Sequence, residues 1–515
     1  MNKTLPKAIS LTLIAVCSLG WEAARGQVHG PLLFPKDDYT VETMRVRTSA
    51  GERDVTYHSY MHIPYVANPV DKDYQSLNVS VPIQVDGVTI DATKAPVLFN
   101  ITVGGYMSVN NATGPMGAPP PPGAAGPGRS EEPGGPRTLR PGGNSSVSSK
   151  QDLALAAGYV VVTPGARGRD NLANDGTYYG KAPAAIVDLK AAVRYIRSND
   201  SVMPGNANWI VSTGCSAGGA LSALLGASGN SPLYDEYLEE IGAADVDDHI
   251  FASACFSPIT DLEHSDMSYE WMYGTTPTRS GVVDQELSRQ LRQSYGEYQE
   301  SLGLEGKNGF GPLTADNYDE YLLLYYLIPS ANEYLNDLTD EERKEYLATN
   351  RWITWSGNSA TFAFGDYVAH VGRMKSLPAF DDFDMRQPEP ILFGNRTTDA
   401  RHFTNFSLRQ ASGNPNAEID DELRTAVNMM NAMYFLGQND SDVAGYWWLR
   451  NGTRDNHNSQ TVMVNLATTL ENRNKEVNAW VFWDGGHCAD YDPEGLIAWI
   501  GNITGFPRQP NVGNN

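Results

Sequence analysis

The chain has 515 residues and a formal net charge of -23. It is long enough to bury a large core, and its hydrophobic content of 41% excludes a chain that is disordered throughout. The excess of acidic residues argues against nucleic acid or an anionic membrane as a partner, because this surface would repel either of them.

The N-terminus has the order of segments that is typical of a secretory signal peptide. Lys3 and Lys7 precede an apolar run over 9–19, and small residues follow up to Gly26. We therefore expect residues 1–26 to be a signal peptide and the mature protein to be secreted. A membrane anchor is the alternative, but the apolar run is short for one. Secretion would permit glycosylation at the sequons that begin at Asn78, Asn100, Asn111, Asn144, Asn199, Asn395, Asn405, Asn439, Asn451 and Asn502.

Residues 27–258 are expected to form the first part of a catalytic core domain, which a later segment of the chain completes. Apolar and polar residues alternate from Pro31 to Thr102, which predicts a β-rich beginning. Residues 114–149 are dense in Pro, Gly and Ser and cannot bury enough apolar surface to fold, so we expect a disordered loop there. A proline-rich ligand for a partner domain is the alternative interpretation of that segment.

A repeating order of strands and helices follows this loop. Apolar runs at 159–163 and 251–256 predict buried strands, and apolar residues at helical spacing over 186–196 predict an amphipathic helix. A further short apolar run ends at Gly214 and leads directly into a small, apolar helical pattern that reaches Gly226. Strands that alternate with helices in this way predict a parallel sheet.

The junction between that last strand and helix is the pentapeptide Gly214-Cys215-Ser216-Ala217-Gly218, which has the Gly-x-Ser-x-Gly pattern of a nucleophile elbow. The turn is so tight that side chains at positions 214 and 218 would collide with the neighbouring strand and helix. The hydroxyl of Ser216 would then project out of the sheet. The pattern alone is weak, because a glycine-rich protein can carry it in an ordinary turn.

The alternation stops over 259–415, where Tyr, Trp, Asp and Glu are frequent and helical stretches such as 318–327 occur. We interpret this segment as a large inserted lid domain, with an independent second domain as the alternative. The alternation resumes in 416–515, with strand candidates at 446–450 and 477–483. This last segment is expected to complete the core.

Serine is a weak nucleophile at neutral pH, so it needs a base within hydrogen-bond reach and an acid that orients the base. Asp455 and His487 follow the last two strand candidates, in the chain order Ser, Asp, His that is expected of an α/β-hydrolase. We therefore predict an α/β-hydrolase fold, a mostly parallel sheet with flanking helices, in which Ser216, Asp455 and His487 form the triad. No cofactor is expected, and no cluster of His, Cys and Asp residues has the spacing of a metal site.

A glycine pair, Gly104-Gly105, follows a strand candidate at 96–102. Hydrolases of this type use backbone N–H groups at such a position for half of an oxyanion hole. Taken alone, the pair is more simply interpreted as a plain glycine turn.

The cysteines add a constraint on the site. Cys215 directly precedes Ser216 and Cys488 directly follows His487, so the two cysteines must lie close together if the serine and the histidine meet. In an oxidising compartment they would form a disulfide that holds the nucleophile and the base in register. Two free, buried thiols are the alternative. Cys255 lies in an apolar strand candidate and is assigned to the core.

The order Cys-Ser, Asp, His-Cys resembles the secreted tannase and feruloyl esterase group. Wider runs, among them Lys190–Tyr195, Gly214–Gly226 and Arg373–Phe380, are more similar still to bacterial-type tannases. The resemblance covers most of the mature chain, with the Pro/Gly-rich loop as an insertion.

This resemblance implies the same triad, with the backbone N–H groups of Gly105 and Ala217 as the oxyanion hole. It also implies that Lys375 and Glu389 of the lid bind the hydroxyls of a galloyl group. A third position in the family, two residues beyond the catalytic acid, is an aspartate, whereas this sequence has His457 there.

These features predict a secreted serine carboxylesterase that hydrolyses phenolic-acid esters through an acyl-enzyme, most simply galloyl esters. Its partner would be a small-molecule or plant polyphenol ester. A feruloyl or other hydroxycinnamoyl esterase is the alternative among enzymes. From another class, the alternative is a catalytically inactive hydrolase-fold binding protein, which the intact triad disfavours. The sequence leaves the oligomeric state open.

Overall fold

The computed structural model describes residues 32–110 and 147–507. The predicted signal peptide at 1–26 lies outside this range, and so does the predicted loop at 114–149 up to residue 146. Among the described residues, no helix has both the length and the apolar composition that crossing a membrane requires.

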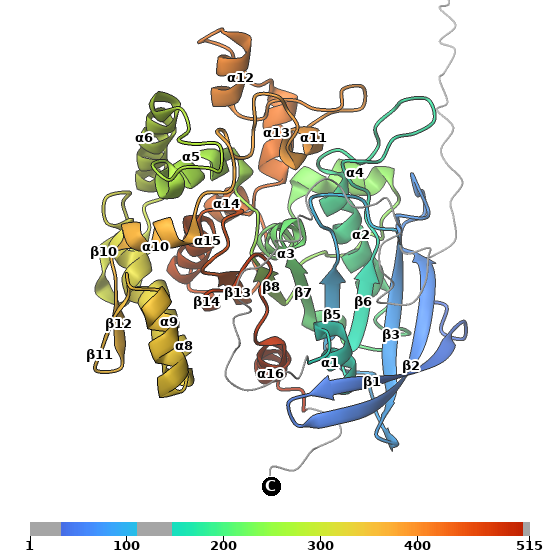
Figure 1. The fold of residues 1–515 in the computed structure, drawn as a ribbon. Coiled ribbons are helices and arrows are strands. Elements are labelled where there is room, and N and C mark those ends of the chain that lie inside the picture. Colours follow the sequence, from blue (N-terminus) through green and yellow to red (C-terminus); the bar gives the residue numbers. More distant parts are fainter. Residues whose placement is uncertain (1–31, 111–146, 508–515) are drawn as a thin grey trace, which may run out of the picture. The chain divides into compact units, whose positions relative to one another are not determined.

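A ten-stranded mixed sheet forms the centre of the fold (Figure 1). Its strand order is β1-β2-β3-β6-β5-β7-β8-β13-β14, and β4 pairs with β3. The antiparallel part consists of β1 (Thr40–Thr48), β2 (Gly51–Pro64), β3 (Ser76–Val85) and β4 (Val88–Thr89). The parallel part consists of β5 (Val97–Ile101), β6 (Val160–Pro164), β7 (Ile210–Cys215), β8 (Ala252–Phe256), β13 (Tyr446–Gly452) and β14 (Glu476–Phe482). The predicted β-rich beginning and mostly parallel sheet are confirmed.

The register of the parallel strands brings their carboxyl ends to one edge of the sheet. Cys215 of β7 and Arg450 of β13 are both paired with Phe256 of β8, and Gly452 is paired with Phe482 of β14. The loops that leave β7, β13 and β14 therefore start side by side. In open α/β sheets this edge is where sites form.

Helices cover both faces of the sheet. Parallel crossovers are right-handed, so the direction of a crossover along the sheet decides which face its helix covers. The connection from β5 to β6 runs in the direction opposite to the later connections in the strand order. Its helix α1 (Lys150–Ala156) therefore lies on one face, and the helices α2 (Ala184–Ser198), α3 (Ala217–Ala227) and α15 (Gln460–Asn472) lie on the other face. The last helix, α16 (Pro493–Thr504), packs on α1. A short helix, α4 (Asp235–Glu240), follows α3. This arrangement confirms the predicted α/β-hydrolase fold.

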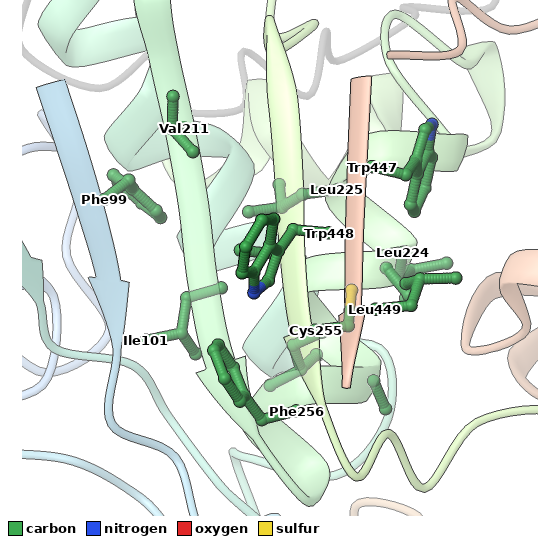
Figure 2. Packing of buried hydrophobic residues seen from close by; sticks show 14 of the residues in the cluster. Phe99, Ile101, Val211, Leu224, Leu225, Cys255, Phe256, Trp447, Trp448 and Leu449 are labelled. Atoms are coloured by element: carbon green, nitrogen blue, oxygen red, sulfur yellow. The ribbon is translucent and has the colours of Figure 1, made fainter. Parts of the chain in front are cut away.

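Strand β13 packs against helices on both faces of the sheet (Figure 2). Successive side chains of a strand point to opposite faces. Trp448 packs against Trp499 of α16, with ring centroids 5.5 Å apart, whereas its neighbour Trp447 packs on α3. Gly226 of α3 makes this close approach possible, because a Cβ atom there would lie 2.7 Å from Cη2 of Trp447. Both tryptophans are buried.

The chain between β8 and β13 is mainly helical, and the helical stretch expected at 318–327 is confirmed. Its helices are α5 (Leu262–Tyr273), α6 (Gln285–Ser301), α7 (Tyr318–Leu322), a π-helix at Leu323–Leu327, α8 (Ile328–Asp337), α9 (Asp340–Thr349), α10 (Phe364–Val371), α11 (Pro388–Leu392), α12 (Asn405–Ser412), α13 (Asp421–Met429) and α14 (Ala432–Gly437). The lid boundaries at 259 and 415 stay a prediction.

Two small hairpins within this segment were not predicted: β9 (Glu305–Gly306) with β10 (Gly311–Pro312), and β11 (Thr354–Ser356) with β12 (Ser359–Thr361). The second hairpin turns at Gly357-Asn358, where both residues have positive φ. That dipeptide is a recognised two-residue hairpin turn, so the sequence carried a signal for it.

Candidate active site

Ser216 lies at the sharp turn between β7 and α3 and has the backbone angles φ 59° and ψ -123°. A positive φ is strained for a residue other than glycine, so the turn must be held from outside. The N–H of Ser216 donates to the carbonyl of Phe256 (3.0 Å), and its own carbonyl accepts from the N–H of Ile259 (3.2 Å). As predicted, glycines are required here, because a Cβ at Gly214 would overlap the carbonyl of Gly218.

The predicted acid and base meet in the loops that follow β13 and β14. Nδ1 of His487 lies 2.8 Å from Oδ2 of Asp455, and the N–H of His457 donates to the other carboxylate oxygen at 3.0 Å. Burial opposes ionisation of Asp455, but these bonds and the nearby imidazole rings outweigh it and lower the pKa of the carboxyl group. An ionised Asp455 accepts a hydrogen bond from the Nδ1–H group of His487, which leaves Nε2 of the ring unprotonated and available as a base.

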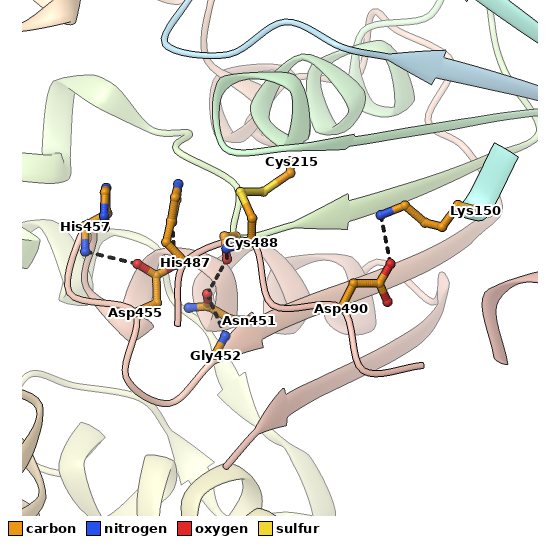
Figure 3. The surroundings of a disulfide bond; sticks show 10 residues. Lys150, Cys215, Asn451, Gly452, Asp455, His457, His487, Cys488 and Asp490 are labelled. Atoms are coloured by element: carbon orange, nitrogen blue, oxygen red, sulfur yellow. Dashed lines mark hydrogen bonds and ion pairs between the residues drawn. A yellow bond between two sulfur atoms is a disulfide. The ribbon is translucent and has the colours of Figure 1, made fainter. Parts of the chain in front are cut away.

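A disulfide joins Cys215 to Cys488, with a Cα–Cα distance of 5.7 Å, which confirms the pairing expected from the sequence (Figure 3). Because each cysteine is a direct neighbour of Ser216 or His487, the bond brings the nucleophile and base loops together. A ring nitrogen of His487 and the two Sγ atoms all lie within 4.8 Å of one another. Both sulfurs are used in the disulfide, so these three residues are not a metal site.

The glycine pair after β5 lies beside the start of α3. A Cβ at Gly218 would lie 2.8 Å from the carbonyl oxygen of Val103, which shows how closely the two segments approach. Nε of Arg169 donates to the carbonyl of Gly105 at 2.7 Å, and its backbone N–H donates to the carbonyl of Tyr106 at 2.9 Å. The N–H of Ala217 belongs to the first turn of α3, where helical N–H groups lack intrahelical partners. The oxyanion-hole role of Gly105 and Ala217 stays a prediction.

Lys375 and Glu389 both lie in the segment between β8 and β13, and Glu389 belongs to α11. Burial raises the pKa of Glu389 in spite of the opposing effect of Lys375, and its Oε2 atom has no hydrogen-bond partner among the described residues. Burial likewise lowers the pKa of Lys375, although Glu389, Asp266 and Asp455 favour its charged form. The ammonium group of Lys375 lies over the ring of Phe380, 3.4 Å from the ring centroid.

His457 stacks on the predicted base. Its ring lies 4.1 Å from that of His487, centroid to centroid, with an angle of 8° between the planes (Figure 3). Burial, with smaller contributions from the charges of His487 and Lys375, lowers the pKa of His457 to about 4. The ring is therefore neutral at neutral pH. Nothing in the sequence predicted this stacking.

Further residues hold the acid and base loops, and sequence reasoning missed them. The N–H of Asp484 donates to Oγ1 of Thr453 (2.8 Å), which connects the loop of His487 to that of Asp455. The hydroxyl groups of Tyr346 and Tyr367 donate to the carboxylate of Asp484 and to the carbonyl of Thr453 (both 2.6 Å). Only Asp484 carried a signal, its position directly after a predicted strand, because the two tyrosines are distant in sequence.

A serine on an elbow at the carboxyl edge of a mostly parallel sheet, with a paired aspartate and histidine on later loops, is the arrangement of α/β-hydrolases that act on carboxylic esters. The structure of Fusobacterium nucleatum tannase is similar with a TM-score of 0.76 at 35% identity, over 92% of this chain and 99% of that chain. Lactobacillus plantarum tannin acyl hydrolase is similar with a TM-score of 0.76 at 32% identity, over 92% and 98%. Structures of tannin acyl hydrolase in complex with ethyl gallate and with 3,4-dihydroxybenzoate match equally well. The chain belongs to the tannase family and is a carboxylic ester hydrolase.

Shorter matches agree with this assignment. The BD-FAE family matches residues 144–292, the part that contains β6, β7 and β8. Esterase LipC of Mycobacterium tuberculosis is 34% identical over 102 residues, which is 20% of this chain and 22% of that esterase. The chain thus spans about a fifth of the length of that relative, and the match adds support for the esterase class alone.

Proposed function

We propose that the protein hydrolyses esters of gallic acid and closely related phenolic acids through an acyl-enzyme on Ser216. The observation that carries this proposal is the buried carboxyl group of Glu389, whose Oε2 atom has no hydrogen-bond partner among the described residues and whose negative charge favours the charged form of Lys375. The complexes of related enzymes with ethyl gallate and 3,4-dihydroxybenzoate support it.

In the acylation step, Oγ of Ser216 attacks the ester carbonyl while Nε2 of His487 removes its proton. Asp455 fixes the tautomer of the imidazole through Nδ1 and stabilises the imidazolium ion. The N–H groups of Gly105 and Ala217 donate to the developing oxyanion. His487 then protonates the alkoxide, the ester bond breaks, and the alcohol leaves a galloyl group on Ser216.

In the deacylation step, His487 removes a proton from water, and the resulting nucleophile attacks the galloyl-Ser216 ester. The same oxyanion hole stabilises the second tetrahedral intermediate. Its collapse breaks the bond to Oγ, which takes back the proton from His487, and releases gallic acid. Apart from the ester and water, each step uses side chains and backbone groups of this chain.

Recognition of the acid depends on its ring hydroxyls. Lys375 donates to them and Glu389 accepts from them, so a bound hydroxyl would give Oε2 of Glu389 the partner that it lacks among the described residues. A buried polar group that stays unpaired is costly, so a substrate without these hydroxyls is bound less well. His457 adds a neutral imidazole at the third position.

A panel of methyl esters tests this proposal: methyl gallate, methyl 4-hydroxybenzoate, methyl benzoate and methyl ferulate. We expect the highest kcat/KM for methyl gallate and a loss of about 10-fold or more when the ring hydroxyls are removed. Lys375→Met should reduce this preference. A higher kcat/KM for methyl ferulate would instead identify a feruloyl esterase.

We also propose that the enzyme is secreted and glycosylated, on the basis of its N-terminal segment and its disulfide. Glycans require exposed asparagines, and among the described sequons only Asn439 and Asn502 are exposed, whereas Asn395 and Asn405 are half-buried. Asn78, Asn100, Asn199 and Asn451 are at most 6% exposed and are excluded in the folded protein. Mass mapping of the secreted product tests both statements, and a retained residue 1 or glycan-free Asn439 and Asn502 would contradict them.

A further inference from the structure

Tyr269 of α5 connects two segments of the active site through one hydroxyl group. The side chain is completely buried. Its hydroxyl lies 3.0 Å from the carbonyl of Asn456, 3.2 Å from the N–H of Met374 and 3.1 Å from the N–H of Lys375. A tyrosine hydroxyl has one proton to donate and can accept two hydrogen bonds, so all of its capacity is used.

The two segments have different tasks. Asn456 lies between the catalytic acid Asp455 and the stacked His457, whereas Met374 and Lys375 belong to the segment that supplies the lysine for the phenolic hydroxyls. We propose that Tyr269 is a positioning residue that couples recognition of the acyl ring at Lys375 to the alignment of the triad at Asp455. The proposal rests on the proposed function of Lys375.

Helix α5 anchors residues 373–381, which we call the lysine segment, through hydrogen bonds and an ion pair. Asp266, Tyr269 and Glu270 are spaced at i, i+3 and i+4, so they share one face of the helix. The carboxylate of Asp266 accepts from the N–H groups of Phe380 (2.7 Å) and Asp381 (3.1 Å). These bonds fix the end of the segment that follows Lys375.

A buried ion pair fixes the beginning of the lysine segment. Glu270 pairs with Arg373, and both side chains are fully buried. The guanidinium of Arg373 also donates to the carbonyl groups of Lys375 and Ser376, each at 2.8 Å. Both anchors join the segment to α5 alone. Tyr269 differs from them, because its hydroxyl also reaches the Asp455 loop.

Tyr273, one turn further along α5, provides the matched comparison. It is equally buried, but among the described residues its hydroxyl makes a single long contact, 3.4 Å to the carbonyl of Asp455. It therefore contacts the acid loop and makes no bond through its hydroxyl to the lysine segment. Loss of this hydroxyl affects the triad for every substrate alike.

The physical consequence of a shared hydroxyl is that the two segments move together. A displacement of about 1 Å in an active-site group can cost about 100-fold in rate. Binding of the ring hydroxyls by Lys375 would restrain the Asp455 loop through Tyr269, so that binding energy from the acyl ring is used to align the reacting groups. An ester whose ring has no hydroxyls cannot use this connection.

The test is the selectivity ratio, defined as kcat/KM for methyl gallate divided by kcat/KM for methyl benzoate. In Tyr269→Phe we expect this ratio to fall about 10-fold, mainly through kcat for methyl gallate. In Tyr273→Phe we expect both rates to fall together and the ratio to stay within about twofold of wild type. Melting temperatures verify that both variants are folded.

A double-mutant cycle with Lys375→Met separates coupling from a general structural effect. If Tyr269 acts through Lys375, Tyr269→Phe should not lower the ratio further once the lysine is absent. An unchanged ratio in folded Tyr269→Phe, or the same loss with and without Lys375, overturns the inference. A wild-type enzyme without preference for methyl gallate would instead contradict the proposed function itself, and this result is known before any variant is made.

Discussion

His457 lies flat against His487, with ring centroids 4.1 Å apart. The predicted base is thus held on its edge by Asp455 and on one face by a second imidazole, which remains neutral because its pKa is lowered to about 4. The resemblance to tannases implies a carboxylate at this position. The environment of the base in this enzyme is therefore less negative than that family pattern implies.

Exchange of this ring for a carboxylate should change the pH dependence of the reaction. In His457→Asp the added negative charge beside His487 stabilises the imidazolium ion, so the acidic limb of the kcat/KM profile should move to higher pH by about one unit. His457→Asn adds no charge and should leave the limb in place. Profiles with methyl gallate measure this, and an unchanged limb in His457→Asp would show that the stacked ring does not act on the base.

The lowered pKa of His457 also predicts an effect on stability. The unfolded histidine takes up its proton near pH 6.5 and the folded one near pH 4, so between these values the unfolded state binds more protons and stability falls as the pH falls. The contribution over this window is about 3 kcal/mol. Urea unfolding at pH 7 and pH 4.5 should show a smaller pH-dependent loss in His457→Asn. Equal losses in wild type and variant would contradict the prediction.

The disulfide between Cys215 and Cys488 should matter for both stability and catalysis. It closes a loop with a sequence separation of 273, for which the chain-entropy model gives about 6 kcal/mol as an upper figure. The double variant Cys215→Ser with Cys488→Ser should unfold at a lower urea concentration than the wild type. Its kcat should fall by a larger factor than its KM changes, because the loops of the nucleophile and the base are no longer held together. Cys255→Ala, which removes a buried free thiol, is the control for loss of a cysteine. Equal kcat in wild type and double variant would show that the disulfide is not needed for alignment.

The sequence predicted the parts of this site that depend on order along the chain. Elbow glycines, an acid and a base after consecutive strands, and cysteines next to Ser216 and His487 are local patterns, and the parallel sheet brings their loops to one edge. The disulfide pairing followed from that geometry.

The remaining interactions of the site could not be predicted from the sequence, because they depend on tertiary contacts between distant residues. The contacts of Tyr269 with Asn456 and Lys375 join residues more than 100 positions apart, and a tyrosine in a helix carries no sign of them. Lys375 and Glu389 became candidates only through resemblance, since isolated charges in a helical segment are usually solvated. The stacking of His457 depends on the exact course of two loops, which no pattern in the sequence specifies.

The most direct test of the central claim is the activity of Ser216→Ala on methyl gallate, measured beside the wild type with mass spectrometry of rapidly quenched reactions. We predict that kcat falls by several orders of magnitude in a folded variant, and that a galloyl adduct on Ser216 is found only in the wild type. Activity close to that of the wild type in Ser216→Ala would contradict the account.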